Sequence, residues 1–295
     1  MTKRSAEEQA SRSLVIGGSG LVGGFIVEHL VRSGQRPLAL LRTSRSDELV
    51  EWCQGDLQTP AALKFPPFST LYCTVDAALL SEALPHLIQP SLKRLVAFSS
   101  TSVLTKQDTE VVLRLSAAEL QIDATCAHHD IGWTILRPTL IYGNGRDTNI
   151  TPLSQLIRRF RFMPLVGGGP GLRQPVHAED LAIGAIAAAT SAAAINKFYS
   201  LPGSETVTYR EMIGRIFDEL RLPRRFLYVP PWIWRAAFVA INPLFLGANV
   251  AMGLRMMKDM CFDAAAARRD FGWRQRAFKP ELTRQPDSER TVLNP

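Results

Sequence analysis

Cysteine is scarce in this chain, and no two cysteines lie close together in the sequence. The 295 residues contain four: Cys53, Cys73, Cys126 and Cys261. A disulfide-stabilised secreted domain would need more of them, and a thiolate metal site would need pairs at short spacing. Cys126 precedes His128 and His129, but this run lacks a second pair of ligands. We therefore expect reduced thiols, a cytoplasmic protein and no metal site.

The start of the sequence lacks the apolar segment of a secretory signal. Residues 1–12 are polar and of mixed charge, and we expect them to form a flexible extension. The stretch 279–295 is also polar and contains Pro280 and Pro286, so we expect a flexible tail there. With 46% hydrophobic residues in the chain, the body between them can bury a full core.

Charge is missing altogether from residues 236–254, which Arg235 and Arg255 flank. The length of this stretch approaches that of a membrane span. Pro243 and Gly247 interrupt it, and a proline removes a backbone hydrogen bond from the middle of a helix. We expect two short helices that cover a substrate cleft or a partner surface. A peripheral contact of residues 236–254 with a bilayer is the alternative.

Acidic residues are fewer than basic ones, which gives a formal net charge of +7. This balance suits an anionic ligand such as a nucleotide, and equally nucleic acid or an anionic membrane. The basic residues are spread along the chain, apart from short pairs such as Arg158-Arg159 and Arg224-Arg225. Such scatter is typical of a solvated surface, so we expect no binding of nucleic acid.

What the sequence does have is an apolar strand that leads directly into a glycine-rich turn, over residues 14–23. Gly17, Gly20 and Gly23 recur at every third position. Glycine allows a tight turn, lets the backbone approach a pyrophosphate and lets a helix pack closely on a strand. The expected helix 20–32 would present its N–H groups and positive dipole end to the phosphates. The pattern predicts a dinucleotide site; the alternative is a strand-to-helix turn that binds nothing.

Short runs rich in Val, Leu and Ile alternate with segments of helical spacing in the first half of the chain. The runs lie near residues 14–16, 37–41, 49–53, 71–75, 95–98 and 133–136, and the candidate crossover helices are 20–32, 76–88 and 110–129. This alternation predicts an α/β fold, a Rossmann-like doubly wound parallel sheet with helices on both faces. Such sheets bind their ligands at the carboxyl ends of the strands.

We place this dinucleotide-binding domain at residues 13–149, with the chain returning to it over about 176–201. Residues 150–278 should form mainly a small substrate-binding α/β lobe. The helices expected after residue 149 are 151–161, 178–190 and 209–220, and the strands lie near 197–201 and 226–229.

Five further motifs follow the glycine turn in order. They are Gly55-Asp56-Leu57, the Ser99-Ser100 pair after the run 95–98, the segment 133–143 with Leu136-Arg137-Pro138 and Tyr142-Gly143, Val176 to Ala182, and Phe271-Gly272-Trp273. With these motifs, residues 13–278 resemble the extended short-chain dehydrogenase/reductase superfamily, the NAD-dependent epimerase/dehydratase group. Each segment alone also fits a buried strand, a helix cap or a surface turn, and the resemblance depends on their order.

The resemblance implies a bound NADP or NAD. The residues it assigns to the cofactor are Gly17, Ser19, Gly20, Leu21, Val22, Gly23, Arg42, Ser44, Asp56, Leu57, Cys73, Ser99, Pro138 and Leu140. Among them Asp56 would contact the adenine amino group. Arg42 follows the second strand, where an acidic residue would bind the ribose of NAD, and a guanidinium can pair with a 2′-phosphate. We therefore prefer NADP; an exposed arginine at a strand end is the alternative.

The chain departs from the superfamily at its Tyr-x-x-x-Lys pair, whose i, i+4 spacing turns both side chains toward the cleft. No tyrosine here is followed four residues later by lysine. Val111 and Leu115 align with the two positions, and neither can exchange a proton. Ser100 stands where the family keeps its third catalytic residue, so it is our catalytic candidate. Lys106, Asp108 and Glu110 lie on the shortened loop and could reach inward, and Arg114, one residue from the lysine position, could hold the ribose or a substrate phosphate. For each of the four a solvated charge is the simpler interpretation.

On the substrate side, Arg173 lies where relatives that act on nucleotide sugars keep an arginine for the diphosphate, and Tyr142 belongs to the Tyr-Gly signature. An exposed loop arginine is the alternative for Arg173, and we expect a structural role for His177.

Three interpretations of function follow. The first is an NAD(P)-dependent epimerase, dehydratase or reductase that acts on a nucleotide-linked sugar by hydride transfer, with a non-standard active site; the resemblance also admits a homodimer. The second is a catalytically inactive NADP(H)-binding sensor or assembly protein. The third is a membrane-peripheral reductase of a lipid-linked substrate, motivated by residues 236–254.

Overall fold

The computed structural model describes residues 12–43, 45–105, 109–241 and 250–282. The chain divides into two compact units. Unit 1 consists of residues 12–138, 178–201 and 263–274, and unit 2 of residues 139–177, 202–262 and the segment that begins at Gln275. We expected the first boundary near residue 149, but the chain leaves unit 1 at Pro138. It also returns to unit 1 a second time, at Asp263, which the sequence did not indicate.

Unit 1 contains a seven-stranded sheet in the order β11-β6-β5-β4-β1-β2-β3. The strands are β1 (Ser13–Ile16), β2 (Leu38–Leu41), β3 (Glu51–Gln54), β4 (Thr70–Cys73), β5 (Arg94–Phe98), β6 (Gly132–Pro138) and β11 (Lys197–Leu201). Every neighbouring pair is parallel. The predicted Rossmann-like fold is confirmed.

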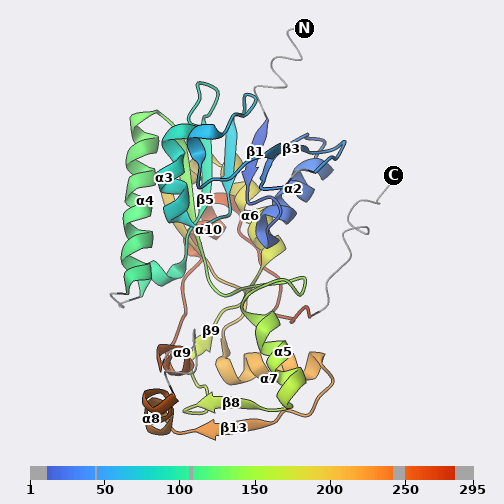
Figure 1. Ribbon diagram of the computed structural model, residues 1–295, viewed down its shortest axis with the longest axis vertical. Coiled ribbons are helices and arrows are strands. Elements are labelled where there is room, and N and C mark those ends of the chain that lie inside the picture. The colour runs from blue at the N-terminus through green and yellow to red at the C-terminus, as the bar shows by residue number, and fades with distance from the viewer. Residues whose placement is uncertain (1–11, 44, 106–108, 242–249, 283–295) are drawn as a thin grey trace. The chain divides into compact units, whose positions relative to one another are not determined.

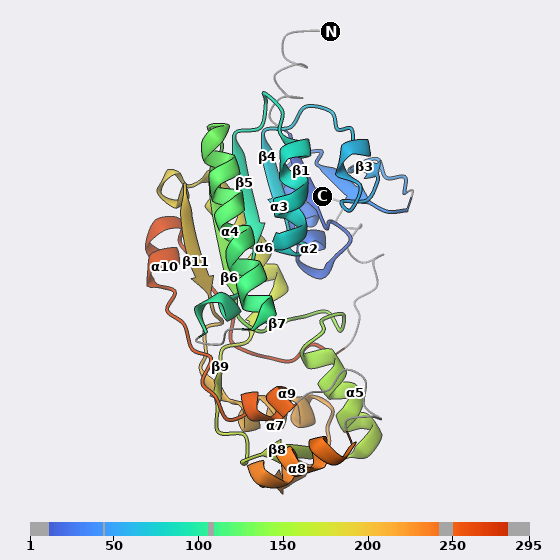
Figure 2. The ribbon, with the colours of Figure 1, turned by 60° about the vertical axis from the view of Figure 1, so that its left-hand side comes forward.

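Helices cover both faces of this sheet (Figures 1 and 2). The helices of unit 1 are α2 (Leu21–Arg32), α3 (Ala77–Leu87), α4 (Glu110–His128), α6 (Ala178–Thr190) and α10 (Ala265–Phe271), with short 3-10 turns η1 (Pro60–Ala62), η2 (Thr101–Leu104) and η3 (Ala192–Ala194). Helix α3 packs against α4 and α2 packs against α6. The chain reverses the winding between β1 and β4, so the carboxyl ends of these two strands are where a doubly wound sheet binds its ligand.

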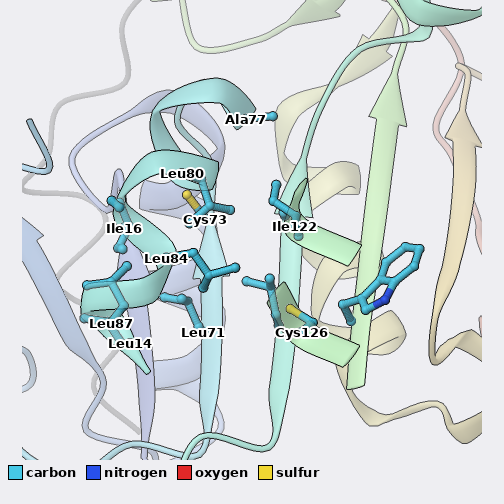
Figure 3. Close-up of a cluster of buried hydrophobic side chains, with 14 of the residues drawn as sticks. Leu14, Ile16, Leu71, Cys73, Ala77, Leu80, Leu84, Leu87, Ile122 and Cys126 are labelled. Atoms are coloured by element: carbon cyan, nitrogen blue, oxygen red, sulfur yellow. The ribbon is translucent and has the colours of Figure 1, made fainter. Parts of the chain in front are cut away.

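The core of unit 1 lies between the sheet and the helices α3 and α4 (Figure 3). Leu80 and Leu84 of α3 and Ile122 of α4 are fully buried against Leu14 and Leu71 of the strands. Burying each of these side chains is worth about 1.5–3 kcal/mol. This layer fixes where α4 runs.

Arg94, at the start of β5, is a buried cation that holds α6 in place. Its guanidinium donates to the carbonyls of Ala188 at 2.9 Å and Ala189 at 3.1 Å, and to the hydroxyl of Thr134. The last carbonyls of a helix have no partner within the helix and carry its negative dipole end. Arg94 satisfies two of those of α6, so its role is structural.

Unit 2 is built from short elements around its own core. They are β7 (Ile141–Tyr142), α5 (Ile150–Phe160), β8 (Met163–Val166), β9 (Leu172–Arg173), β10 (Val176–His177), β12 (Val207–Thr208), α7 (Tyr209–Glu219), β13 (Phe226–Val229), α8 (Pro231–Ile241) and α9 (Val250–Arg255). Strands β8 and β13 pair in parallel, as do β7 and β10, whereas β9 and β12 are antiparallel. Ile157, Leu165 and Phe217 lie at the centre of the core.

The uncharged stretch 236–254 contributes to α8 and α9, as the expected two short helices require. Residues 242–249 between them lie outside the described part of the chain. Among the helices that are described, none is both long and apolar enough to cross a bilayer.

Candidate functional site

The glycine turn between β1 and α2 is packed too tightly for a side chain at Gly17 or Gly23. Gly17 has a φ of +84°, which favours glycine, and its carbonyl accepts a hydrogen bond from Gly20 N at 2.8 Å. A Cβ on Gly23 would overlap that same carbonyl oxygen, and a Cβ on Gly17 would overlap Thr74 Oγ1. Gly17 and Gly23 therefore leave no room for a side chain, whereas a Cβ on Gly20 would lie 3.0 Å from the carbonyl oxygen of Gly17.

The N-terminal end of α2 is open toward solvent. Ser19 and Gly20 are exposed, no side chain caps the helix at Gly20, and the first turn contains no acidic residue. The first i, i−4 hydrogen bond of α2 joins Gly24 N to Gly20 O. The N–H groups of the helical residues before Gly24 therefore have no acceptor within the helix. An accessible helix N-terminus of this kind attracts phosphate oxygens. The turn fits the diphosphate of a dinucleotide.

Thr74, directly after β4, is a residue of this turn that sequence reasoning missed. Its hydroxyl lies 3.2 Å from Ile16 O and 3.4 Å from Gly17 O, toward which it can donate. It thereby ties the end of β4 to the end of β1. The contact could be anticipated only from the pairing of β1 with β4, in which Ile16 lies opposite Cys73.

At the end of β2, cationic side chains follow the strand. Arg42 is exposed, and the Arg45 guanidinium stacks over the ring of Trp52 on β3, 4.8 Å from the ring centre. Ser44, assigned to the cofactor from the resemblance, lies outside the described residues. These groups leave the strand end open to an anion.

The Gly55-Asp56-Leu57 element forms a turn after β3. Asp56 Oδ1 accepts a hydrogen bond from Gln58 N at 2.9 Å, which fixes its carboxylate. Leu57 and Cys73 are 5% and 0% exposed, with their side chains in the core of unit 1. Any contact of these two residues with a ligand would therefore use the backbone.

The two serines after β5 have different environments. Ser100, the catalytic candidate, caps η2, and its hydroxyl accepts a hydrogen bond from Ser102 N at 3.1 Å. Ser99 donates its N–H to Leu136 O at 2.8 Å, while its buried hydroxyl has no hydrogen-bond partner among the described residues. Thr101 Oγ1 donates to Pro138 O at 3.1 Å and joins the ends of β5 and β6. The Ser99 hydroxyl is thus buried and without a partner among the described residues, whereas the Ser100 hydroxyl is engaged.

Helix α4 carries Val111 and Leu115, the two residues that we aligned with the tyrosine and the lysine from the sequence, and neither is a proton donor. Val111 is 52% exposed, whereas Leu115 is 7% exposed and belongs to the core of unit 1. Of the other candidate acids, Glu110 begins α4 and is exposed, whereas Lys106 and Asp108 lie outside the described residues.

Arg114, next to the lysine position, is already engaged. Its two terminal nitrogens donate to the two carboxylate oxygens of Asp76 at 2.9 and 2.8 Å. Asp76 follows β4 and caps α3 by accepting from Ala78 N at 2.8 Å. Burial raises the pKa of Asp76, but the hydrogen bonds and the charge of Arg114 outweigh this and lower the pKa below its ordinary value. Both groups are therefore charged at neutral pH.

Arg173, the candidate for substrate phosphates, lies on β9 of unit 2 and is 7% exposed. Its guanidinium donates to the carbonyls of Leu172 and Lys258, both at 2.7 Å, and to that of Arg255. Burial lowers its pKa. The alternative of an exposed loop arginine is wrong, because the side chain anchors the segment 255–258. A role toward substrate stays a prediction.

Tyr142, the second substrate candidate, is 1% exposed. Its ring packs edge-on against His177 and Phe278, with ring centres 5.2 and 5.0 Å apart. His177 Nε2 lies 3.1 Å from Glu281 Oε2, and this partner lowers the pKa of Glu281. Gly143 has a φ of +140° and lies against the His177 ring. This cluster is a packed structural element of unit 2.

Leu140, assigned to the cofactor, also belongs to unit 2, where its side chain packs on the core and its carbonyl accepts from Val176 N at 2.9 Å. Within the described part of the chain, no three His, Cys, Asp or Glu side chains gather closely enough to hold a metal ion.

Comparison with known proteins gives remote relatives. No family model matches the sequence. Over 244 residues the chain is 22% identical to NADH dehydrogenase (ubiquinone) 1 alpha subcomplex subunit 9, mitochondrial, of Arabidopsis thaliana. This match covers 73% of the chain and 60% of the plant protein, so the chain spans less than two thirds of that relative.

Solved structures resemble the chain over almost its whole length. An epimerase of the methanogen Methanothermobacter thermautotrophicus superposes with a TM-score of 0.73 at 17% identity, covering 94% of this chain and 92% of that one. MoeE5, solved in complex with UDP-glucuronic acid and NAD, gives 0.70 at 18%, covering 91% and 95%. The resemblance to the epimerase/dehydratase group is thus confirmed in the fold.

Proposed function

We propose that unit 1 binds a pyridine dinucleotide, NAD(P), at the turn between β1 and α2. The observation that carries this proposal is the glycine turn itself, in which Gly17 and Gly23 leave no room for a Cβ while the N-terminus of α2 remains uncapped and exposed. An uncapped helix N-terminus leaves N–H groups without acceptors and gives up the stability that a capping side chain would add. A bound diphosphate would supply those acceptors.

Different residues of unit 1 would contact different parts of the cofactor. The N–H groups at Ser19, Gly20 and the following first turn would hold the diphosphate, and Asp56 the adenine. Ser99 would meet the nicotinamide end with its unpartnered hydroxyl. Each of these groups lies at or just beyond the carboxyl end of a strand of the parallel sheet.

We prefer NADP to NAD because Arg42 and Arg45 follow β2. Exposed guanidinium groups pair with the 2′-phosphate that distinguishes NADP, whereas the ribose of NAD is bound by an acidic residue at this place. Arg45 is held over Trp52, which reduces the entropy that it would lose on binding.

As an enzyme, the protein would act on a nucleotide-linked sugar. A bound nicotinamide supplies a hydride donor or acceptor, and the chain must hold the sugar and manage a proton. MoeE5, which shares the fold, was solved with UDP-glucuronic acid and NAD. Here the proton would have to be managed by a hydroxyl such as that of Ser99 or Ser100, because Val111 and Leu115 cannot do so. Slow turnover is the expected consequence.

A second candidate function is cofactor binding without turnover, as in a sensor or an assembly subunit. The observation that favours it is the Arg114–Asp76 pair, which uses the ionisable group nearest the lost lysine position for a structural contact. The plant relative is named as a subunit of NADH dehydrogenase. In this case the bound nucleotide would stabilise the fold, or its binding would report the ratio of NADPH to NADP in the cell.

Titration of NADPH, NADP, NADH and NAD into the full chain by calorimetry tests the binding proposal. We expect Ser19→Glu to weaken binding at least ten-fold, about 1.4 kcal/mol, because it places a carboxylate at the anion site. Ser19→Gln introduces a side chain of nearly the same shape as glutamate but without the charge, and it should keep most of the affinity for the nucleotide. If no heat is detected with any of the four nucleotides, the proposal is wrong.

Turnover then separates the two candidate functions. A panel of nucleotide sugars, with NADPH followed by absorbance and products by mass spectrometry, should give repeated turnovers for the enzyme. Binding of NADPH with no product from any of them would favour the sensor or assembly protein.

A further inference from the structure

Unit 2 carries a cluster of large apolar side chains in contact with solvent, which we call the aromatic face. Its members are Leu227 and Tyr228 of β13, Trp232 and Ile233 of α8, and Met257 after α9. Trp232 is 70% exposed, Tyr228 61% and Leu227 53%. Exposed single hydrophobic residues are common, but five large ones on neighbouring segments of one unit indicate an interaction surface.

The backbone around these side chains brings them together. Strand β13 pairs with β8, and both strands run toward α8 and α9 (Figure 1). The glycines after β8 have positive φ; the ring of Tyr228 lies by Gly168, and the side chain of Met257 lies by Gly167. Trp234 turns inward and packs on Gly253 of α9, which leaves Trp232 and Ile233 on the outer side of α8.

Arg173 makes the aromatic face rigid. Its buried guanidinium binds the carbonyls of Arg255 and Lys258, on either side of Met257. Gly171 N adds a hydrogen bond to Met256 O at 2.9 Å. The backbone on both sides of the exposed Met257 is therefore fixed. Binding of a partner to Met257 then costs little conformational entropy of the backbone.

Exposed cations lie close in the sequence to the members of the aromatic face. The exposed side chains of Arg225, Arg235, Arg255 and Lys258 lie next to its members in the chain. At the amino ends of the strands, Met163 N donates to Arg225 O at 2.9 Å, which brings the exposed Arg161 and Phe162 beside Arg225.

Acidic groups nearby are used internally. Asp259 accepts from Leu172 N at 2.9 Å. Glu205, Glu211 and Asp218 pair with Arg215 or Arg224. Asp259 keeps its negative charge, but the exposed Arg225, Arg235, Arg255 and Lys258 outnumber it, so the charge close to the aromatic face is net positive.

We propose that the aromatic face docks on a membrane surface that contains anionic lipids. Tryptophan and tyrosine favour the headgroup region, where the ring is buried and the polar atom stays hydrated. Arginine and lysine at the rim would meet lipid phosphates, as in interfacial segments with an apolar side and a basic border. An acidic protein would satisfy the cations, but five exposed apolar side chains with a basic border fit a lipid interface better. The proposal does not depend on cofactor binding.

Flotation of the full chain with vesicles tests the proposal. The protein should float with vesicles of phosphatidylcholine mixed with phosphatidylglycerol, remain unbound with phosphatidylcholine alone, and be released by high salt. Trp232→Ser combined with Tyr228→Ser should lower partitioning at least ten-fold, and so should Arg235→Gln combined with Arg255→Gln. Matched controls in unit 1 are Leu113→Ser with Leu120→Ser, which are also exposed, and Arg36→Gln.

Thermal unfolding and nucleotide titration of each variant show that the fold is kept. Three results would overturn the proposal: no flotation of the wild-type chain with anionic vesicles, equal flotation with phosphatidylcholine alone, or unchanged flotation of the Trp232/Tyr228 variant. The last result would assign the contact to another segment, such as residues 236–254. The first would leave a protein partner for the aromatic face.

Discussion

The guanidinium of Arg114 binds both carboxylate oxygens of Asp76, 38 residues earlier in the chain. The pair joins the first turns of α4 to the loop after β4. Asp76 in this loop is two residues after Thr74, whose hydroxyl contacts the glycine turn. The arginine that directly precedes the buried Leu115 in α4 is therefore occupied by a carboxylate.

This pair should contribute little to stability by itself, while Asp76 should contribute more. The side chains of Arg114 and Asp76 are 48% and 42% exposed, and such surface pairs are worth about 0–1 kcal/mol. We expect Arg114→Ala to lower the free energy of unfolding by less than about 1 kcal/mol. Asp76→Ala also removes the cap of α3 and should cost about 1 kcal/mol more. Asp76→Asn keeps a capping oxygen and should resemble Arg114→Ala in urea denaturation. Equal losses for Asp76→Ala and Asp76→Asn would contradict this division.

The glycine turn should tolerate no methyl group at Gly23. Because the added Cβ would overlap the carbonyl of Gly17, we expect Gly23→Ala to cost about 1–3 kcal/mol and to weaken nucleotide binding. Gly34→Ala is the matched control: its φ is +82° but the space around it is empty, so only the backbone cost of about 1–2 kcal/mol applies. Nucleotide affinity of Gly34→Ala should equal that of the wild type in calorimetry. An unaltered affinity in Gly23→Ala would show that the turn adjusts.

The buried pair of Arg137 and Glu119 should behave differently from the exposed one. Arg137 Nε donates to Glu119 Oε1 at 2.9 Å, the carboxylate is 4% exposed, and the guanidinium stacks over Phe198. Removing one partner of a buried pair leaves the other charge buried without a counter-charge. Glu119→Leu should therefore lower the free energy of unfolding by about 3–5 kcal/mol. Arg137→Met combined with Glu119→Leu should recover much of that loss. A double-mutant cycle in denaturant measures the coupling, and additive losses would contradict it.

Asp270 should make stability depend on pH in the acid range. It accepts from Arg269 Nε at 2.8 Å, Tyr199 Oη at 2.6 Å and Lys197 Nζ at 3.1 Å. The hydrogen bond from Arg269, with those from Tyr199 and Lys197, lowers its pKa well below the ordinary 3.8. The unfolded chain therefore binds the proton first, and the stabilisation is present above about pH 4 and is lost as pH falls further. The curve of unfolding free energy against pH should be less steep below pH 4 in Asp270→Asn. Parallel curves for the two proteins would rule out this contribution.

Local patterns predicted the elements that depend on neighbours in the chain. The apolar runs marked β1, β4, β5 and β6, and Asp76 and Thr109 stand where helices begin. The glycine turn was visible because its geometry is set within seven residues. The ends of elements were less certain, as with β3, which begins at Glu51: it is the edge strand of the sheet and its residues are half-buried or exposed, so apolar residues do not mark where it starts.

Contacts between distant residues could not be predicted in the same way. Ser100 matched a catalytic position, yet the structure shows its hydroxyl capping η2 and the neighbouring Ser99 hydroxyl without a partner. Arg173 stood in a glycine-rich loop sequence typical of exposure, and it is buried because the carbonyls of residues 255 and 258 surround it.

The sequence by itself determined the parallel α/β sheet, the glycine turn and the absence of any tyrosine followed four residues later by lysine, because alternation of apolar runs, glycine spacing and residue identity are local properties. Only the tertiary structure decided that Arg114 binds Asp76, that Arg173 anchors a backbone segment and that Tyr228, Trp232 and Met257 are exposed. These relationships depend on which distant segments the hydrophobic core brings together, and a charged or aromatic side chain carries no local sign of the partner that it will meet.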